Sequence, residues 1–188
     1  TGPTLRNVEA ASTGTMCLTE WIPEIELMFP VNTVDYFNDL SKLLSFDDEI
    51  LDKIVEIKSK IIATNENGGK ILIFGNGGSA AIASHFSVDL TKNAKVRAVN
   101  FNEADLITCF ANDYGFENWI AEAINFYADE QDSVIFISSS GKSQNMVLGA
   151  EKAKQNKLNS IITFTGFEKD NLLSSKGDIN IWIDSKAY

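Results

Sequence analysis

Two short segments rich in glycine and serine are the parts of this sequence best suited to bind a phosphate group. Residues 75–79 (GNGGS) follow the apolar run ILIF, residues 138–143 (SSSGKS) follow VIFI, and a predicted helix comes after each. Glycines let a backbone approach a ligand, and a helix N-terminus supplies free N–H groups and the positive end of a dipole. Serine hydroxyls add donors, so the pattern indicates a site for a phosphate monoester. Each loop could instead be an ordinary turn, with Ser79 or another serine capping the next helix.

Two nucleotide-binding motifs overlap these loops. The GKS ending of the second loop fits the end of G-x-x-x-x-G-K-[ST], but the first glycine of that motif would fall on Phe136, which excludes it. Gly75, Gly77 and Ala80 fit the dinucleotide pattern G-x-G-x-x-[GA], and Glu103 lies where a ribose-binding acid would be expected. This second alternative stays open, although it gives the serine-rich loop no role.

The single histidine, His85, precedes Asp89 by four residues on a predicted helix, so their side chains share one face. Such a pair could bring an imidazole and a carboxylate to one metal ion. It could also place Asp89 as a base near the predicted site. The alternative is an ordinary surface pair, because no second histidine or nearby cysteine pair completes a zinc site.

Alternating strands and helices must position these residues. Short apolar runs separated by helices predict a parallel sheet covered on both faces. The strands are expected at 71–74, 96–101, 134–137, 160–164 and 179–183, and the helices between them at 79–90, 104–111, 116–127 and 143–156. Ligands bind such sheets beyond the carboxyl ends of the strands, which is where both loops fall.

Two amphipathic helices are predicted before the first strand. The first begins at Thr33, and its apolar residues are Val34, Phe37, Leu40, Leu43 and Leu44. The second is capped by Asp47 or Asp48 and ends at Gly68 and Gly69, with Leu51, Ile54, Val55, Ile61 and Ile62 on one side. These faces must be buried on the domain or on another copy of the chain. Residues 1–30 lack a sustained period and are expected to form a loosely packed or disordered extension before a domain over 31–188.

Composition narrows the possible partners and the compartment. The 188 residues carry 16 Lys+Arg against 26 Asp+Glu, a net charge of −10, which disfavours binding to nucleic acids and anionic membranes. No apolar run is long enough to predict a membrane-spanning helix. The two cysteines, Cys17 and Cys109, exclude a disulfide framework and a four-cysteine zinc site, and suit the reducing cytoplasm.

Four segments in a fixed order resemble a known family. They are ILIFGNGGSAAIASHF, FANDYGFEN, ISSSGKSQN and IITFTG, and over about residues 31–188 they are similar to the SIS (sugar isomerase) domain, in particular to the phosphoheptose isomerases. The resemblance implies a flavodoxin-like, three-layer α/β/α sandwich with a five-stranded parallel sheet. It also implies a homotetramer with the long N-terminal helices in its core.

The resemblance further implies a set of site residues. The phosphorylated sugar would be held by Asn76, Gly77, Gly78, Ser79, Asp89, Asn112, Asp113, Ser138, Ser139, Ser140 and Ser143. Zinc would bind His85 and Asp89, where the family usually has a glutamate at the second position. Asp89 would also be the catalytic base. The remaining zinc ligands of the family, a glutamine and a histidine, lie on a C-terminal helix that we expect this sequence to lack.

The implied activity is an aldose–ketose isomerisation. Sedoheptulose 7-phosphate would become D-glycero-manno-heptose 7-phosphate, a precursor of lipopolysaccharide or capsule heptose, through an enediol, and zinc would polarise the sugar oxygens. Three alternatives stay open, and the expected absence of the last helix and the aspartate at position 89 favour the first of them. They are a non-catalytic SIS module such as a protein that binds the replication initiator DnaA, a different sugar-phosphate isomerase, and a regulator that senses a sugar phosphate.

Overall fold

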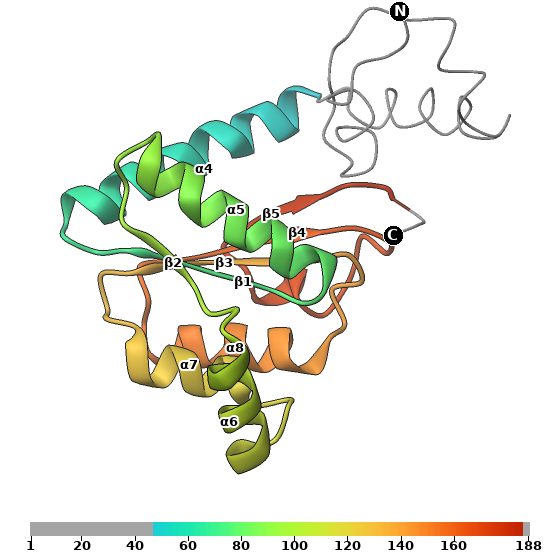
Figure 1. The fold of residues 1–188 in the computed structure, drawn as a ribbon. Helices are drawn as coiled ribbons and strands as arrows, with labels where there is room; N and C mark the ends of the chain where they lie inside the picture. The colour runs from blue at the N-terminus through green and yellow to red at the C-terminus, as the bar shows by residue number, and fades with distance from the viewer. Residues whose placement is uncertain (1–46, 186–188) are drawn as a thin grey trace, which may run out of the picture. The chain divides into compact units, whose positions relative to one another are not determined.

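A five-stranded, all-parallel sheet forms the centre of the molecule (Figure 1). The computed structural model describes residues 47–185. The strands are β1 (Ile71–Gly75), β2 (Ala98–Asn100), β3 (Ser133–Ser138), β4 (Ser160–Thr165) and β5 (Ile179–Trp182), in the spatial order β2-β1-β3-β4-β5. All five predicted strands are confirmed. The edge strand β2 is shorter than predicted, because the N–H of Val96 bonds to Leu90 O at the end of the preceding helix.

Helices cover both faces of the sheet and make the predicted three layers. On one face lie α4 (Asp48–Glu66) and α5 (Gly78–Lys92), and on the other lie α6 (Ala104–Tyr114), α7 (Trp119–Tyr127) and α8 (Gln144–Gln155) (Figure 1). A short 3₁₀ helix, η1 (Ser174–Lys176), was not predicted. The strand order is the flavodoxin-like one and differs from the order of dinucleotide-binding sheets, which argues against the dinucleotide alternative. No helix within residues 47–185 has the length and apolarity needed to cross a membrane.

The start of α4 confirms a predicted cap and corrects a predicted face. The side chain of Asp47 accepts a hydrogen bond from the N–H of Ile50 at 2.8 Å, so Asp47 is the N-cap. The side chains that pack on the sheet are Ile57 and Ile61. The other four residues of the predicted apolar face are exposed in the single chain: Leu51, Ile54, Val55 and Ile62. The helix predicted from Thr33 and the extension over residues 1–30 lie outside the described residues.

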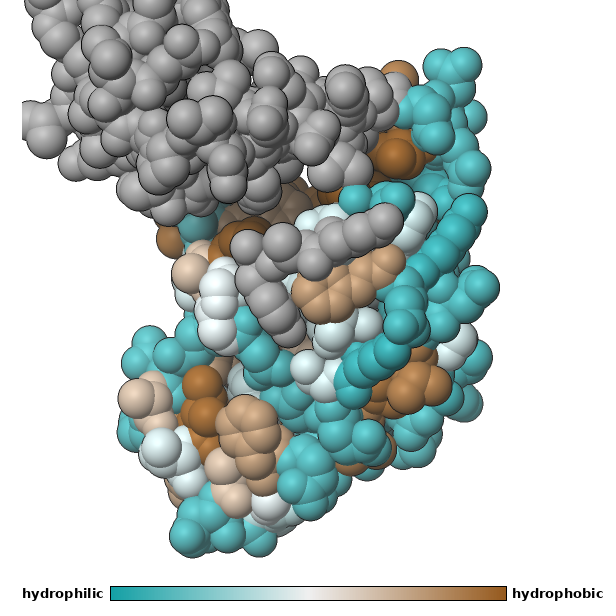
Figure 2. Space-filling model, turned by 90° about the vertical axis from the view of Figure 1, so that its right-hand side faces the viewer, coloured by the Kyte–Doolittle hydropathy of each residue, from teal (hydrophilic) through white to brown (hydrophobic). Residues whose placement is uncertain are grey.

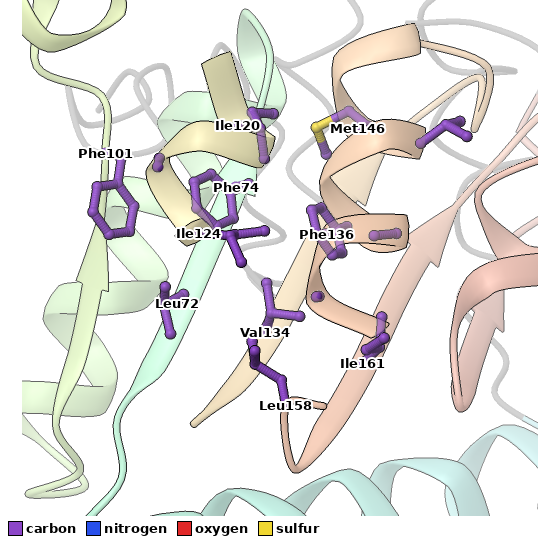
Figure 3. Close-up of a cluster of buried hydrophobic side chains, with 14 of the residues drawn as sticks. Leu72, Phe74, Phe101, Ile120, Ile124, Val134, Phe136, Met146, Leu158 and Ile161 are labelled. Carbon is purple, nitrogen blue, oxygen red and sulfur yellow. The ribbon is translucent and has the colours of Figure 1, made fainter. Parts of the chain in front are cut away.

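Apolar side chains alternate between the two faces of the central strands. Leu72 and Phe74 of β1 point toward α7 and α8 and belong to a cluster that includes Ile124 and Met146 (Figure 3). Ile71 and Ile73 point to the opposite face, toward α4 and α5. The strands therefore read as continuous apolar runs, because both of their faces are buried. Each such side chain contributes about 1.5–3 kcal/mol to the free energy of folding when it is fully buried. On α7, Trp119, Ile120, Ala123 and Ile124 are buried as expected, but Phe116 precedes the helix and is exposed.

Candidate functional site

The two predicted phosphate loops leave neighbouring strands side by side. β1 and β3 pair in parallel with Gly75 opposite Ile137, and paired strands lie about 4.8 Å apart. From β1 the chain crosses to β2 on one side, and it later returns to β3 on the other side. This reversal is the switch point at which open α/β sheets bind their ligands. Both loops project to the side of the molecule shown in Figure 2, where hydrophilic residues surround smaller apolar patches.

A pair of asparagines joins the two loops into one structure. The amide of Asn76, in the first loop, donates to Asn145 Oδ1 at 3.0 Å and accepts from Asn145 Nδ2 at 3.0 Å. Asn145 is 2% exposed, and its Oδ1 also accepts the N–H of Met146 at 3.0 Å. Asn145 is not among the predicted site residues. The only signal was its place in the segment ISSSGKSQN, where a polar residue in the first turn of a helix suggests a surface position.

The fold requires a glycine at one position of the first loop but not at another. A Cβ on Gly75 would lie 2.4 Å from the backbone of Ser79, so the turn itself requires glycine there. A Cβ on Gly78 would meet nothing within 4 Å, so the fold of the described chain gives no reason for a glycine at that position. An approaching ligand would give one. The N–H groups of Gly77 and Gly78 find no acceptor within residues 47–185, which leaves two donors at the start of α5.

The alternative in which Ser79 caps this helix is wrong. The helix begins at Gly78 with Gly77 as the N-cap residue at φ 54°, and no side chain makes a capping hydrogen bond. The N–H of Ser79 instead bonds to Asn76 O at 3.0 Å. Its hydroxyl is therefore not used as a cap.

The second loop uses some of its serines internally and leaves others available. Ser138 is buried, and its Oγ accepts the N–H of Gly141 at 3.2 Å. Ser140 Oγ accepts the N–H of Lys142 at 3.3 Å. Ser143 occupies the N-cap position of α8, but its side chain makes no capping bond. The N–H of Ser140 has no acceptor in the described part of the chain, so it adds a donor to those at the start of α8.

The two loops contain one cationic side chain, that of Lys142. Lys142 is the only Lys or Arg in residues 75–79 and 138–143. Its Nζ lies 2.7 Å from Glu168 Oε2, and both side chains are largely exposed. A bound anion would therefore be compensated mainly by helix dipoles and N–H groups, with Lys142 as the one Lys or Arg that the two loops supply.

His85 and Asp89 lie along the outer flank of α5. His85 Nε2 is 3.6 Å from Asp89 Oδ2, and the side chain of His85 is 81% exposed. Asp89 Oδ1 also accepts a hydrogen bond from Asn93 Nδ2 at 3.1 Å. His85 comes seven residues after Gly78, about 10 Å along the helix at 1.5 Å per residue.

The described residues do not complete a metal site. No group of three or more His, Cys, Asp or Glu side chains within residues 47–185 is placed to hold a metal ion. His85 and Asp89 together supply two donors, and a catalytic zinc has three protein ligands. Zinc binding therefore does not fit these residues alone.

Asn112 and Asp113 lie in the last turn of α6. Asn112 Nδ2 donates to Asp113 Oδ1 at 2.9 Å, and the thiol of Cys109 lies 3.8 Å from Asp113 Oδ2. Both residues are exposed. Among the described residues their side-chain bonds stay within α6, so the structure of the single chain does not link them to the two loops.

The flavodoxin-like strand order and the two joined loops at its switch point define an α/β protein built to bind a small ligand. The sequence gives the family. A family model, the SIS domain, matches residues 35–166, and the chain belongs to this family. A phosphoheptose isomerase from Helicobacter pylori (strain P12) is 40% identical over 121 residues, which cover 61% of this chain and 62% of that protein. The chain spans about half to two thirds of the length of the curated relatives it matches.

Solved structures of two phosphoheptose isomerases share the fold. The protein from Neisseria gonorrhoeae, GmhA, aligns with a TM-score of 0.72 at 26% identity, over 80% of this chain and 82% of that chain. The protein from Francisella tularensis aligns with a TM-score of 0.73 at 25% identity, over 83% of this chain and 86% of that chain. The predicted α/β/α fold and the resemblance to this family are thus confirmed.

Proposed function

We propose that the chain is a sugar-phosphate isomerase that converts sedoheptulose 7-phosphate to D-glycero-manno-heptose 7-phosphate. One observation carries the proposal: two loops with unused hydrogen-bond donors, joined by Asn76 and Asn145, meet at the switch point of the sheet. The names of the similar proteins supply the reaction. The serine loop would hold the phosphate at one end of the open-chain sugar, with Ser139, Ser140 and Ser143 as hydroxyl donors and Ser138 stabilising the turn.

The distance along α5 between the first loop and His85 suits a long substrate, and Asp89 lies one further turn, about 6 Å, along the helix. The carbon chain of a seven-carbon sugar has a contour of roughly 9 Å, from six C–C bonds of about 1.5 Å. That is comparable with the separation of about 10 Å along α5 between Gly78 and His85. A phosphate held in the loops would thus direct C1 and C2 toward the flank that carries His85 and Asp89. There Asp89 would take a proton from C1 and return it to C2, while the hydroxyl proton of O1 moves to O2.

Zinc at His85 and Asp89 stays a prediction that requires at least one ligand from outside the described residues. The prediction can be tested separately from phosphate binding, by measuring the metal content of the purified protein and of a His85→Ala variant. An equal zinc content in the two proteins would remove His85 from any metal site. Phosphate affinity should be the same in both proteins, because His85 has no contact with the serine loop.

The test of the phosphate site is calorimetric titration of sedoheptulose 7-phosphate into variants that lack one hydroxyl. Ser140→Ala and Ser143→Ala should each lose about 1.5–3 kcal/mol of binding free energy, because the acceptor is charged. Ser59→Ala is the matched control, since its exposed hydroxyl bonds only to Val55 O within α4. Unchanged affinity in both loop variants would overturn the phosphate assignment.

A sugar-phosphate-binding module without turnover is the second candidate. The observation that favours it is the incomplete set of metal donors in residues 47–185. The two candidates differ in one measurement, the conversion of sedoheptulose 7-phosphate by protein that demonstrably binds it. Tight binding without conversion, even with added zinc, would establish the module.

The predicted homotetramer finds support in α4. Four large apolar side chains on this helix are 39–62% exposed in the single chain: Leu51, Ile54, Val55 and Ile62. Exposed apolar groups of this size gather at protein–protein contacts. Light scattering should give four times the chain mass, and Val55→Asp should lower the assembly state. A monomer for the unmodified chain at micromolar concentration would contradict the prediction.

A further inference from the structure

The backbone of the serine loop is held by the segment that follows β4. The N–H of Gly166 bonds to Ser139 O at 2.9 Å, and the N–H of Leu173 bonds to Gly141 O at 2.9 Å. In a trans peptide the C=O of one residue and the N–H of the next point in opposite directions. The N–H groups of Ser140 and Lys142 therefore point away from residues 166–173. The orientation of these donors depends on a segment that itself has no predicted contact with the ligand.

One side chain in that segment packs directly under the loop. Asn171 is 3% exposed, and a Cβ on Gly141 would lie 2.0 Å from its Oδ1. Gly141 has φ 60°, in the left-handed region that favours glycine. The loop can therefore pass this close to Asn171 only with glycine at position 141.

Hydrogen bonds fix the amide of Asn171 in place. Its Nδ2 donates to Thr165 Oγ1 at 3.0 Å and to Glu168 O at 3.0 Å, and its Oδ1 accepts the N–H of Ser174 at 2.9 Å. A buried amide held by three hydrogen bonds has a fixed orientation, and removing one partner leaves the amide group that bonded to it unpaired. The surface against which Gly141 rests is thus fixed in position.

We infer that Asn171 is a positioning residue for the phosphate site: it sets the path of the serine loop at Gly141 and so directs the open N–H donor of Ser140 beside it. The inference rests on the proposed function, since it takes a phosphate group as the ligand. It assigns Asn171 no contact with the substrate. Its expected effect is on affinity, because a loop held less firmly presents its donors less accurately.

The chain contains a matched control for this arrangement. Asn180 accepts a hydrogen bond from Thr163 Oγ1 at 2.6 Å and donates to Gly177 O at 3.1 Å. A Cβ on Gly177 would lie 2.3 Å from Asn180 Oδ1. Like Asn171, Asn180 bonds to a threonine of β4 and packs against a glycine. That glycine, Gly177, precedes β5 and lies away from the serine loop.

The experiment compares Asn171→Ala with Asn180→Ala. Dissociation constants for sedoheptulose 7-phosphate and inorganic phosphate are measured by calorimetry, together with KM, kcat and the melting temperature. Asn171→Ala should weaken both ligands about tenfold or more and raise KM with little change in kcat, because displaced donors are costly on a scale of about 1 Å. Asn180→Ala should lower the melting temperature and leave both affinities unchanged.

A gentler pair of variants covers the case in which Asn171→Ala does not fold. Thr165→Val removes one partner of Asn171, and Thr163→Val removes the equivalent partner of Asn180. Only Thr165→Val should weaken the binding of phosphate. The expected loss of affinity is about threefold, as for one displaced hydrogen bond.

The outcomes separate this inference from the proposed function. If the unmodified protein binds neither ligand, the proposed phosphate site is wrong and the inference falls with it. If the unmodified protein binds both ligands but Asn171→Ala and Thr165→Val bind them equally well, the site stands and Asn171 has no positioning role. An equal loss of affinity in the Asn171 and Asn180 variants would also overturn it, since that pattern indicates general destabilisation.

Discussion

The two ends of the sheet use their polar groups in opposite ways. At the amino end, Asp132 is 1% exposed and accepts three hydrogen bonds, from the N–H groups of Lys70 and Asp129 and from Lys70 Nζ. Nearby, Thr64 Oγ1 and Ser133 Oγ lie 2.7 Å apart. At the carboxyl end, the N–H groups of Gly77, Gly78 and Ser140 have no acceptor within residues 47–185.

This difference separates stability from binding. Polar groups whose bonds are made inside the chain hold the fold together, and breaking one bond leaves its partner unpaired. Donors left open at a surface contribute nothing to the fold and are available to a ligand. Substitutions of the bonded groups at the amino end should therefore change unfolding alone, and those that reach the open donors at the carboxyl end should change affinity.

The largest effect is expected from Asp132→Ala at the amino end. It should lower the free energy of unfolding by about 3–5 kcal/mol, because the charge of Lys70 and two N–H groups lose their buried acceptor. Denaturant unfolding measures this loss. Asp178→Ala is the control, since Asp178 is exposed and its carboxylate accepts one hydrogen bond, from the N–H of Ile161. Equal stabilities of the two variants would contradict the contrast between the two ends.

The next effect concerns two glycines of one loop. Gly78→Ala should leave the free energy of unfolding unchanged or raise it by up to about 1 kcal/mol, because alanine favours helices and meets no clash. It should weaken sugar-phosphate binding about tenfold, since a methyl group would stand where the ligand approaches. Gly75→Ala should instead destabilise the fold. Calorimetry and thermal unfolding of both variants test this, and normal affinity in Gly78→Ala would remove the first loop from the site.

A smaller effect is the pH dependence of the amino end. Burial lowers the pKa of Lys70, but hydrogen bonds and charge from Asp132 and Asp129 outweigh it and leave the pKa above its ordinary value. The stabilisation from charged Lys70 is therefore fully present below the ordinary lysine pKa of about 10.4 and is lost as the pH rises through the higher folded value. Unfolding measured from pH 7 to 11 should show a steeper alkaline loss in the unmodified protein than in Lys70→Met. Identical slopes would refute this.

The smallest effect is expected at the exposed ion pair of Lys142, in the serine loop, and Glu168. Lys142→Met should weaken sugar-phosphate binding by about two- to fivefold, the range of a solvent-exposed charge interaction. Glu168→Gln should strengthen binding slightly, because it releases Lys142 from its partner. Both effects should shrink as salt is added. Affinities that are the same at low and high salt would mean that Lys142 does not contact the anion.

The strands and the two loops could be predicted from the sequence because their signals are local. A strand covered on both faces must be apolar throughout, and VIFI ends where the serines begin. The start of α4 could be predicted from its cap, Asp47. Short motifs indicated the family, and the match to the SIS domain over residues 35–166 confirms it.

The remaining features depend on contacts between distant residues. The bond between Asn76 and Asn145 joins positions 69 residues apart, and the strand order decides that they meet. The apolar residues of α4 form two stripes, and periodicity alone does not say that Ile57 faces the sheet while Val55 is exposed. Asn171 lies in a stretch without periodicity, so its role depends on the fold around Gly141.

The amide pair of Asn76 and Asn145 has an evolutionary consequence. Between them, each side chain donates one hydrogen bond and accepts one, so the two positions are complementary as a pair. Replacing Asn76 alone leaves the buried amide of Asn145 without its partner, and replacing Asn145 alone does the same to the partly buried amide of Asn76. Among family members, the residues equivalent to 76 and 145 should therefore stay constant together or change together. An alignment in which one varies freely while the other stays asparagine would show that the two loops can be joined in another way.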